Sequence, residues 1–441
     1  MKTLGWVFLC LIGPQLVEVT LYLLPRLDKL TSVLAAIGLP SLSLVLWNLL
    51  SPSTSPSYYT TEDTWAVVGG AIAVAAGAYF LLRFRASSLF PPLRIPIRRR
   101  LQTMCTIITW PMSLWGNVLV VILLLASWWT RWLIVVYLAC ISLLDKTPAR
   151  GGWKIKKRHW LYELNGKLCC EFFPVSLVKT TDLAPDASYI FGYHPHGILS
   201  LGAWCNFCTD GTGFSGLFPG LESHLLTLRQ CFWIPLFRQL LLYGGAQDVS
   251  RSTLVKVAST PGQVAVVIVG GAQEALDTSP GTLDLTIKQR KGFVRVALET
   301  GASLVPVVSF GENDLFWTAV GVGSGQDGKP VSRGEGMLRR VQQVLKKAMG
   351  YSLPIFIGRG LLQYKFGLLP YRHPIVSVVG KPLPVGKKLV RPAKDAPEDE
   401  KERYAKAVDD LHSKYMEEVQ SIYDKFKDKY APDRVRDMVF K

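Results

Sequence analysis

The sequence predicts an α/β protein with N-terminal transmembrane helices, a membrane-embedded helical hairpin, and a mostly parallel sheet sandwiched by helices. Three observations predict this class. Long apolar stretches fill the chain before Asp145, and apolar runs of strand length alternate with helical segments after Trp153. Near the carboxyl terminus, apolar residues recur at spacings of three and four, which is typical of an amphipathic helix.

The composition favours a membrane protein. Of the 441 residues 49% are hydrophobic and only 19% are charged, which is more apolar than a typical soluble domain. The net charge of +17 suits an anionic membrane surface, where each nearby cation adds about 1 kcal/mol. Nucleic acid is a weaker explanation, because the basic clusters border apolar segments. We therefore expect no nucleic-acid partner.

Residues 1–103 are expected to hold three membrane segments and a basic loop. Residues 4–24, 34–50 and 65–82 are each apolar. Each is about long enough for one crossing, since a hydrocarbon core of about 30 Å needs about 20 helical residues. Pro14 and Glu18 interrupt the first segment, so a cleaved signal peptide is its alternative, although no small-residue cleavage site follows.

Residues 104–145 are expected to form the helical hairpin. Thr130 and Arg131 divide an apolar stretch into two halves, each too short for a comfortable crossing. A charge at mid-bilayer costs about 2.5–3.5 kcal/mol or more, which favours a return to the same side with Arg131 near the turn. One long tilted helix is the alternative. Basic residues on both flanks place both ends in the cytosol, and the acidic linker 51–63 on the other side.

Residues 146–397 are expected to form a cytosolic α/β domain. Four Val- and Ile-rich runs read as buried strands: SYIFGYH, QVAVVIVG, SLVPVVSF and PIVSVVG. Four stretches read as helices: 222–243 with a break at Pro235, 250–259 with Ser250 as N-cap, 292–300 ended by Gly301, and 335–349. Residues 398–441 are expected to form an amphipathic helix packed on this domain.

Two histidines separated by one proline follow the first of these strands. Residues i and i+2 of an extended segment face the same side, and Pro195 and Gly197 constrain the loop, so the rings of His194 and His196 are expected to be neighbours. A metal site needs more ligands than these two, and we expect no metal. A packed core pair is another alternative. The pattern favours a general base, which contributes about 10²–10⁴-fold to a rate.

Two further clusters fit such a site. Gly270 and Gly271 follow a predicted strand and allow a close backbone approach, and Glu274 comes next as a partner for an imidazole N–H. A surface glutamate is the alternative. Arg290 and Lys291 precede a predicted helix and form a candidate anion site for a phosphorylated compound such as coenzyme A, with a solvated basic turn as the alternative.

Four blocks of the sequence, in this order, resemble the type-2 diacylglycerol acyltransferase family, which includes monoacylglycerol and wax-ester-forming acyltransferases. They are YHPHGILSLGAWCNF, GGAQEAL, RKGFVRVALETGASLVPVVSFGEND and GRG…LLPYRHPIVSVVGKPLPV. The resemblance covers about residues 105 to 425, and it implies a fold like that of glycerolipid acyltransferases. The family's Tyr-Phe-Pro is replaced by Phe172-Phe173-Pro174, which removes a hydroxyl.

The resemblance implies acyl transfer from acyl-CoA to diacylglycerol, making triacylglycerol without an acyl-enzyme. Acyl-CoA, diacylglycerol and membrane lipids are the expected partners, no separate cofactor is expected, and a homo-oligomer is left open. The implied location is the endoplasmic reticulum membrane and lipid droplets. Monoacylglycerol and a fatty alcohol are alternative acceptors. A non-enzymatic lipid-binding or tethering protein on the same fold is the alternative from another class.

The resemblance also assigns site residues. We expect His196 as the base, Glu274 as the group that orients its ring, and His194 as a residue that shapes the site. The expected substrate-binding residues are Gly197, Gly270, Gly271, Arg290, Lys291, Gly292, Phe293 and Asn313. Backbone N–H groups near Gly197 or Gly271 are the expected oxyanion donors.

Overall fold

The computed structural model describes residues 95–441, except 154–158, 319–341, 343–355, 361–366, 387 and 394. The chain divides into two compact units, Met1–Arg83 and Phe84–Lys441, and the described residues belong to the second. The predicted membrane segments 4–24, 34–50 and 65–82 lie outside the described residues, as does nearly all of the helix predicted at 335–349.

The centre of the second unit is a seven-stranded sheet in the order β1-β10-β7-β2-β5-β3-β4. All neighbouring pairs are parallel except β10 and β7, which confirms the predicted mostly parallel α/β fold. The strands are β1 Val175–Lys179, β2 Tyr189–His194, β3 Glu222–Thr227, β4 Gln247–Asp248, β5 Gln263–Ile268, β7 Ser303–Phe310 and β10 Ile375–Val379.

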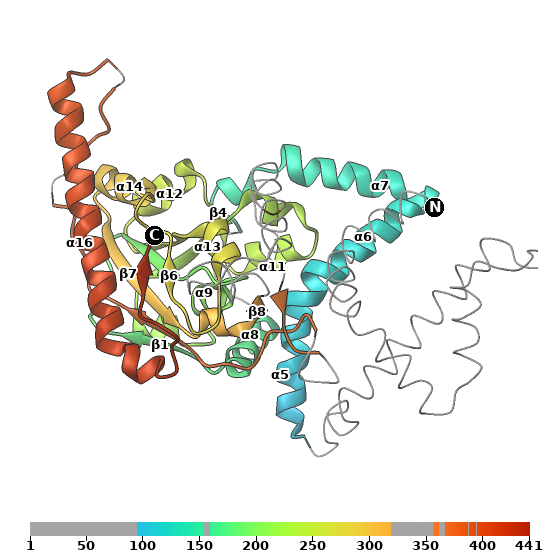
Figure 1. Ribbon diagram of the computed structural model, residues 1–441. Helices are drawn as coiled ribbons and strands as arrows, with labels where there is room; N and C mark the ends of the chain where they lie inside the picture. Colours follow the sequence, from blue (N-terminus) through green and yellow to red (C-terminus); the bar gives the residue numbers. More distant parts are fainter. Residues whose placement is uncertain are drawn as a thin grey trace, which may run out of the picture. The chain divides into compact units, whose positions relative to one another are not determined.

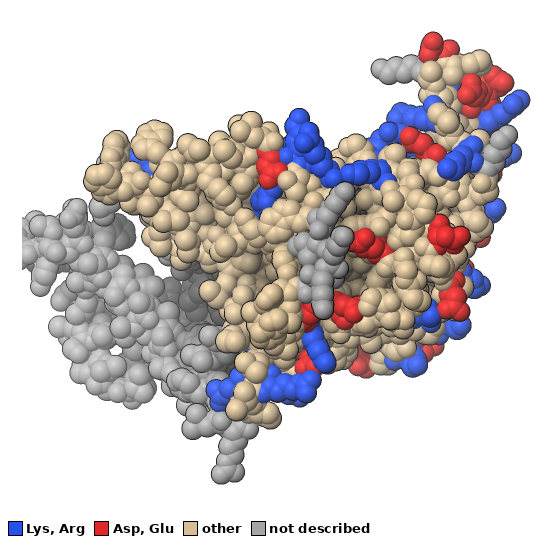
Figure 2. All heavy atoms as spheres, turned by 180° about the vertical axis from the view of Figure 1, so that it is seen from behind, with Lys and Arg blue, Asp and Glu red and all other residues tan. Residues whose placement is uncertain are grey.

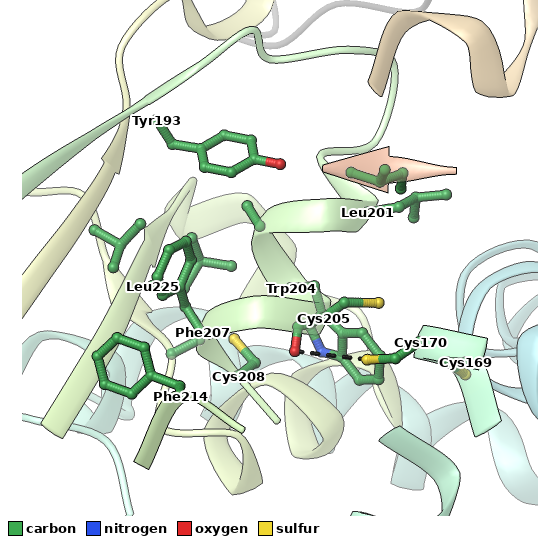
Figure 3. Packing of buried hydrophobic residues seen from close by; sticks show 14 of the residues in the cluster. Cys169, Cys170, Tyr193, Leu201, Trp204, Cys205, Phe207, Cys208, Phe214 and Leu225 are labelled. Carbon is green, nitrogen blue, oxygen red and sulfur yellow. Dashed lines mark hydrogen bonds between the residues drawn. The ribbon is translucent and has the colours of Figure 1, made fainter. Parts of the chain in front are cut away.

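Helices cover both faces of the sheet (Figure 1). One face carries α8 (Trp160–Phe172), α9 (Leu201–Phe207) and α11 (Phe237–Tyr243), and the other carries α12 (Arg251–Ala258), α14 (Gly292–Thr300) and α16 (Glu398–Tyr430). The alternation of strand side chains produces these two cores: Phe191 of β2 packs into the first, shown in Figure 3, and Ile190 packs into the second.

Shorter elements complete the unit. They are α10 (Phe214–Leu217), α13 (Gly271–Asp277), the 3-10 turns Thr147–Ala149, Arg229–Trp233 and Glu312–Leu315, the pair β6 (Asp284–Leu285) and β11 (Val439–Phe440), and the pair β8 (Trp317–Thr318) and β9 (Phe356–Ile357).

Local signals placed several elements correctly. The side chain of Ser250 accepts from Thr253 N and caps α12, and Gly301 ends α14 in the left-handed conformation with φ of 81°. The helix predicted at 222–243 was wrong in its first part, because Glu222–Thr227 is strand β3 between β5 and β4. A short apolar run fits either structure, and pairing with two strands decides it.

Three helices precede the sheet, a basic one followed by two apolar ones. α5 (Ile97–Ile107) continues through a π-helix (Ile108–Gly116) into α6 (Asn117–Ala126), and α7 (Trp128–Ala139) ends in a π-helix at Cys140–Leu144. At the break, Thr130 Oγ1 donates to Leu124 O at 2.6 Å and Arg131 Nε donates to Leu125 O at 2.8 Å. Arg131 thus satisfies carbonyls at the end of α6.

Both ends of the α6–α7 pair contact the region of α11. The amide of Asn117 donates to Pro235 O, and Tyr137 OH and Asp145 accept from Gln239 and Arg238, respectively. Among the described residues, Trp128–Ala149 is long and apolar enough for a membrane span, and α5 with α6 would be a second if a helix bent by 43° counts as one. Figure 2, seen from behind, shows few charged atoms over the α6–α7 part.

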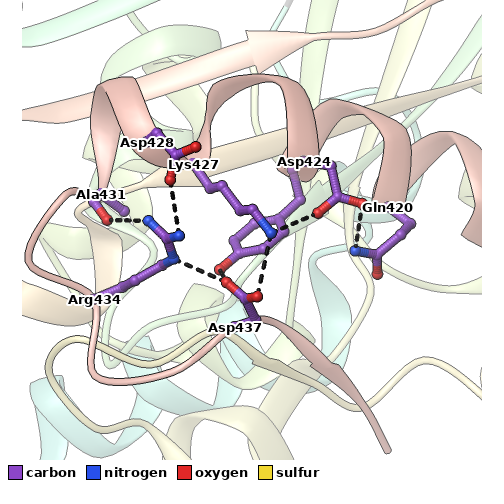
Figure 4. A network of polar contacts seen from close by, with 8 residues as sticks. Gln420, Asp424, Lys427, Asp428, Ala431, Arg434 and Asp437 are labelled. Carbon is purple, nitrogen blue, oxygen red and sulfur yellow. Dashed lines mark hydrogen bonds and ion pairs between the residues drawn. The ribbon is translucent and has the colours of Figure 1, made fainter.

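The long helix α16 packs on the sheet through a buried stripe. Val408, Leu411, Tyr415, Val419 and Ile422 are buried, and the helix contacts β7. Its last turn is tied to the following loop by a network of ion pairs around Asp437, shown in Figure 4. The helix ends at Tyr430, earlier than predicted, because Pro432 cannot continue it, and the chain then adds β11 to β6.

Candidate active site

Three polar groups follow three adjacent parallel strands. His196 comes after β2, Glu274 comes after β5, and Glu312 comes after β7. The sheet order places β2 between β7 and β5. Since the carboxyl ends of parallel strands meet at one edge, residues far apart in the sequence gather there.

The ring of His196 is oriented by its own loop. Its Nδ1 lies 2.9 Å from Gly197 O. A carbonyl oxygen only accepts, so Nδ1 carries the proton and Nε2 keeps its lone pair. Burial lowers the pKa of His196, which favours this neutral form. The residue is partly exposed, in contrast to the fully buried His194.

Glu274 holds the backbone of this loop and not the ring, which differs from the expectation. Its Oε2 accepts from His196 N at 2.8 Å and its Oε1 accepts from Thr286 N at 2.7 Å. Burial raises the pKa of this carboxyl to about 7, against the two N–H bonds and the charge of Arg290, which lower it. A side chain at Gly270 would overlap the carboxyl group, so glycine is needed there for packing.

His194 is fixed in a fully buried position. Its Nε2 lies 2.9 Å from Tyr415 OH, and that hydroxyl donates to Gly192 O at 3.0 Å. The hydroxyl has one proton, so Nε2 of His194 must be the donor in its own bond. Burial lowers the pKa of His194 to about 3. The residue is therefore neutral and hydrogen-bonded to α16, which leaves His196 as the candidate base.

A second buried glutamate lies under the loop. Glu312 Oε2 accepts from Tyr193 OH at 2.9 Å and from Gly202 N at 3.0 Å, while Oε1 is buried without a partner. Burial raises the pKa of this carboxyl to about 7. Gly197, with φ of +60°, is so close that a Cβ there would lie 2.8 Å from Glu312 Cγ. No feature of the sequence predicted that Glu312 would be buried beneath the histidine loop.

The other expected binding residues do not form one cluster and have different surroundings. Gly271 and Gly292 have open space where a Cβ would stand, Arg290 is exposed, and its charge reaches Glu274. Lys291 pairs with Asp409 of α16 at 2.6 Å. Phe293 is buried against Tyr415, with ring centroids 5.0 Å apart.

Asn313 has a different surrounding from the histidine loop. Its side-chain amide donates to Thr282 O at 2.8 Å. Asn313 also lines a pocket of about 120 Å³ together with Gly311 and Arg434. In the described part of the chain, no three His, Cys, Asp or Glu side chains gather as metal ligands. Cys205 and Cys208 are buried in the core shown in Figure 3.

We predict that replacing Glu312 with Gln makes the protein relatively more stable as the pH rises. The raised folded-state pKa means that the stability from Glu312 is full below about pH 4.5 and is lost as the pH rises through about 7. Gln can accept the same two bonds. The difference in free energy of unfolding between Glu312→Gln and wild type should grow by about 3 kcal/mol from pH 4.5 to pH 8.

Denaturant titrations in detergent at several pH values measure this difference. Glu417→Gln, at an exposed position of α16, is the matched control and should show no such growth. A pH-independent difference for Glu312→Gln would contradict the prediction.

The chain was compared with known proteins. A family model described as diacylglycerol acyltransferase matches residues 121–441. Diacylglycerol O-acyltransferase 2A of Umbelopsis ramanniana is 41% identical over 362 residues, which cover 80% of this chain and 94% of that protein. 2-acylglycerol O-acyltransferase 1 of Bos taurus is 41% identical over 361 residues, which cover 80% of this chain and 99% of that protein.

A solved structure, the 1-acyl-sn-glycerophosphate acyltransferase PlsC of Thermotoga maritima, aligns with 74% of this chain and 98% of its own. Its TM-score of 0.29 and identity of 11% are too low to carry an argument. The family model and the two relatives confirm the resemblance seen in the four sequence blocks. The chain belongs to the diacylglycerol acyltransferase family and is an O-acyltransferase.

Proposed function

We propose that this protein transfers an acyl group from acyl-CoA to the free hydroxyl of diacylglycerol, with His196 as the general base. The observation that carries this proposal is the orientation of the ring: Nδ1 is bound to Gly197 O, so Nε2 has a free lone pair. The names of relatives, diacylglycerol and 2-acylglycerol O-acyltransferase, support an acylglycerol acceptor.

The chemical step needs one base and no acyl-enzyme. Nε2 of His196 takes the hydroxyl proton while the alcohol oxygen attacks the thioester carbonyl. The new C–O bond forms, the C–S bond breaks, and the imidazolium returns its proton to the leaving thiolate. Backbone N–H groups near Gly197 and Gly271 are our candidates for the oxyanion site, and Gly271 has open space beside its backbone.

Glu274 supports this step through the backbone of the loop. Its carboxyl group accepts from the N–H of His196, and in its ionised form the negative charge favours the imidazolium that forms during transfer. We infer that Glu274 is a positioning residue.

We predict that His196→Ala lowers kcat by about 10²–10⁴-fold, because the alcohol then loses its proton acceptor. Acyl transfer from labelled acyl-CoA to diacylglycerol by the purified full-length protein measures this loss. His159→Asn is the matched control: His159 is an exposed N-cap of α8, and Asn keeps a capping acceptor, so its kcat should be unchanged. A kcat for His196→Ala equal to that of the wild type would reject His196 as the general base.

Diacylglycerol is the acceptor that we propose, with monoacylglycerol and a fatty alcohol as the alternatives. We predict that kcat/KM is highest for diacylglycerol when the three are compared in one assay. A higher value for monoacylglycerol or fatty alcohol would reassign the acceptor. If the folded wild-type protein binds these three lipids but transfers an acyl group to none of them, a non-enzymatic lipid-binding role would be favoured.

We further propose that the protein is a multi-pass protein of the endoplasmic reticulum membrane and lipid droplets, with the sheet on the cytosolic side. In the α6–α7 pair Trp129 is 86% exposed and Leu133 is 72% exposed, which suits contact with lipid. Because both ends of the pair contact the α11 region, the pair can enter the membrane and return to the same side.

We predict that an Asn-x-Thr acceptor placed before Ile97, or within residues 146–152, escapes glycosylation in microsomes, because both ends of the pair face the cytosol. The same acceptor within residues 51–63 is the control and should be glycosylated, since this linker is expected on the lumenal side. Gel shifts after glycosidase treatment measure the outcome. Glycosylation within 146–152 would favour a single crossing.

A further inference from the structure

A basic groove separates α14 from α16, outside the histidine loop. Its volume is about 620 Å³, and it is lined by Lys291 and Arg295 of the α14 region, Arg391 and its neighbours, and Lys401, Tyr404 and Asp409 of α16. Four of the lining side chains are cations and one is a carboxylate. The groove therefore carries a strong positive charge in a concave surface.

The positive charge of the groove is only partly compensated. Asp409 is bound by Lys291 at 2.6 Å, and Lys401 pairs with Glu398 of the same helix at 3.4 Å. Among the described residues, Arg295 and Arg391 have no ion-pair partner, although both guanidinium groups are near enough to Tyr404 to lower the pKa of its phenol, which burial raises. The hydroxyl oxygen of Tyr404 is buried and has no hydrogen-bond partner in the described part of the molecule. These are the features of a site for a ligand with several anionic oxygens.

One end of the groove is linked to the histidine loop through α14. Lys291 is the neighbour of Arg290, whose charge acts on Glu274. Phe293, one turn into α14, packs on Tyr415, and Tyr415 is bonded to His194. A molecule that fills the groove with its charged end can therefore reach the histidine loop with a long arm.

We propose that this groove binds the phosphate groups of acyl-CoA, so that α16 forms one wall of the donor-substrate site. The inference rests on the proposed function, and it adds Arg295, Arg391, Lys401 and Tyr404 to the site. Phosphate oxygens suit bidentate arginine contacts, and the pantetheine arm separates these phosphates from the reacting thioester. A phospholipid headgroup offers the same chemistry, so the test must distinguish the two.

The test compares the double variant Arg295→Gln/Arg391→Gln with the matched control Lys406→Gln/Lys414→Gln. The control also removes two cations, from exposed positions of α16 outside the groove. Coenzyme A binding to the purified full-length protein is measured by calorimetry, together with kcat and KM for acyl-CoA. We expect the dissociation constant and KM to rise about tenfold or more in the double variant, with kcat little changed. The control should stay near wild type.

Two further arms identify the ligand. Coenzyme A without its 3′-phosphate should bind the wild type more weakly, and the double variant should discriminate less between the two coenzymes. Vesicles of phosphatidylcholine with phosphatidate should compete no better than phosphatidylcholine alone. The single variant Lys401→Gln should also weaken coenzyme A binding. It replaces the double variant in the test if the double variant unfolds at too low a temperature.

Coenzyme binding that is unchanged in the double variant and in Lys401→Gln would overturn the inference. Phosphatidate binding that depends on the two arginines, with coenzyme binding unaffected, would assign the groove to a lipid headgroup and would also overturn it. The binding measurement needs no turnover, so absent acyl transfer with arginine-dependent coenzyme binding would reject the proposed function alone.

Discussion

The bond from the backbone N–H of His196 to the carboxylate of Glu274 is the interaction on which the site depends. It joins the loop after β2 to the first turn after β5, and it fixes the backbone whose next carbonyl, that of Gly197, orients the imidazole. The free lone pair at Nε2, which we propose as the base, is therefore a consequence of backbone geometry. A carboxylate that bound the ring directly would fix the same tautomer but would leave the loop free.

Two buried carboxyl groups lie at this edge, and both are costly to ionise. Burial raises the pKa values of Glu274 and Glu312 to about 7, so neither is firmly charged at neutral pH. Glu274 keeps two backbone donors, while Glu312 has two donors on one oxygen and none on the other. Burying these two carboxyl groups lowers the stability of the fold at neutral pH, but their hydrogen bonds hold the loop in place. Such costs are common at functional sites.

The carboxyl-terminal helix α16 contacts several parts of the site and of the core. Tyr415 is hydrogen-bonded to Nε2 of His194 and packs against Phe293. Ile422 packs toward the sheet, and Asp409 pairs with Lys291. A long helix reaches all of these points because it runs beside β7 and α14 (Figure 1). Removal of α16 would expose the apolar core and the proposed base region together.

Most of the local structure and the candidate site residues could be predicted from the sequence. Strands such as Ser303–Phe310, the cap at Ser250 and the end of α14 at Gly301 follow from side-chain period and backbone preference, which are local. That residues 222–227 form a strand depends on the fold, because pairing with β5 settles a sequence pattern that fits either a helix or a strand. The tertiary structure also decided the roles of Glu274 and Glu312, since burial and hydrogen-bond partners come from distant segments and leave no trace in spacing.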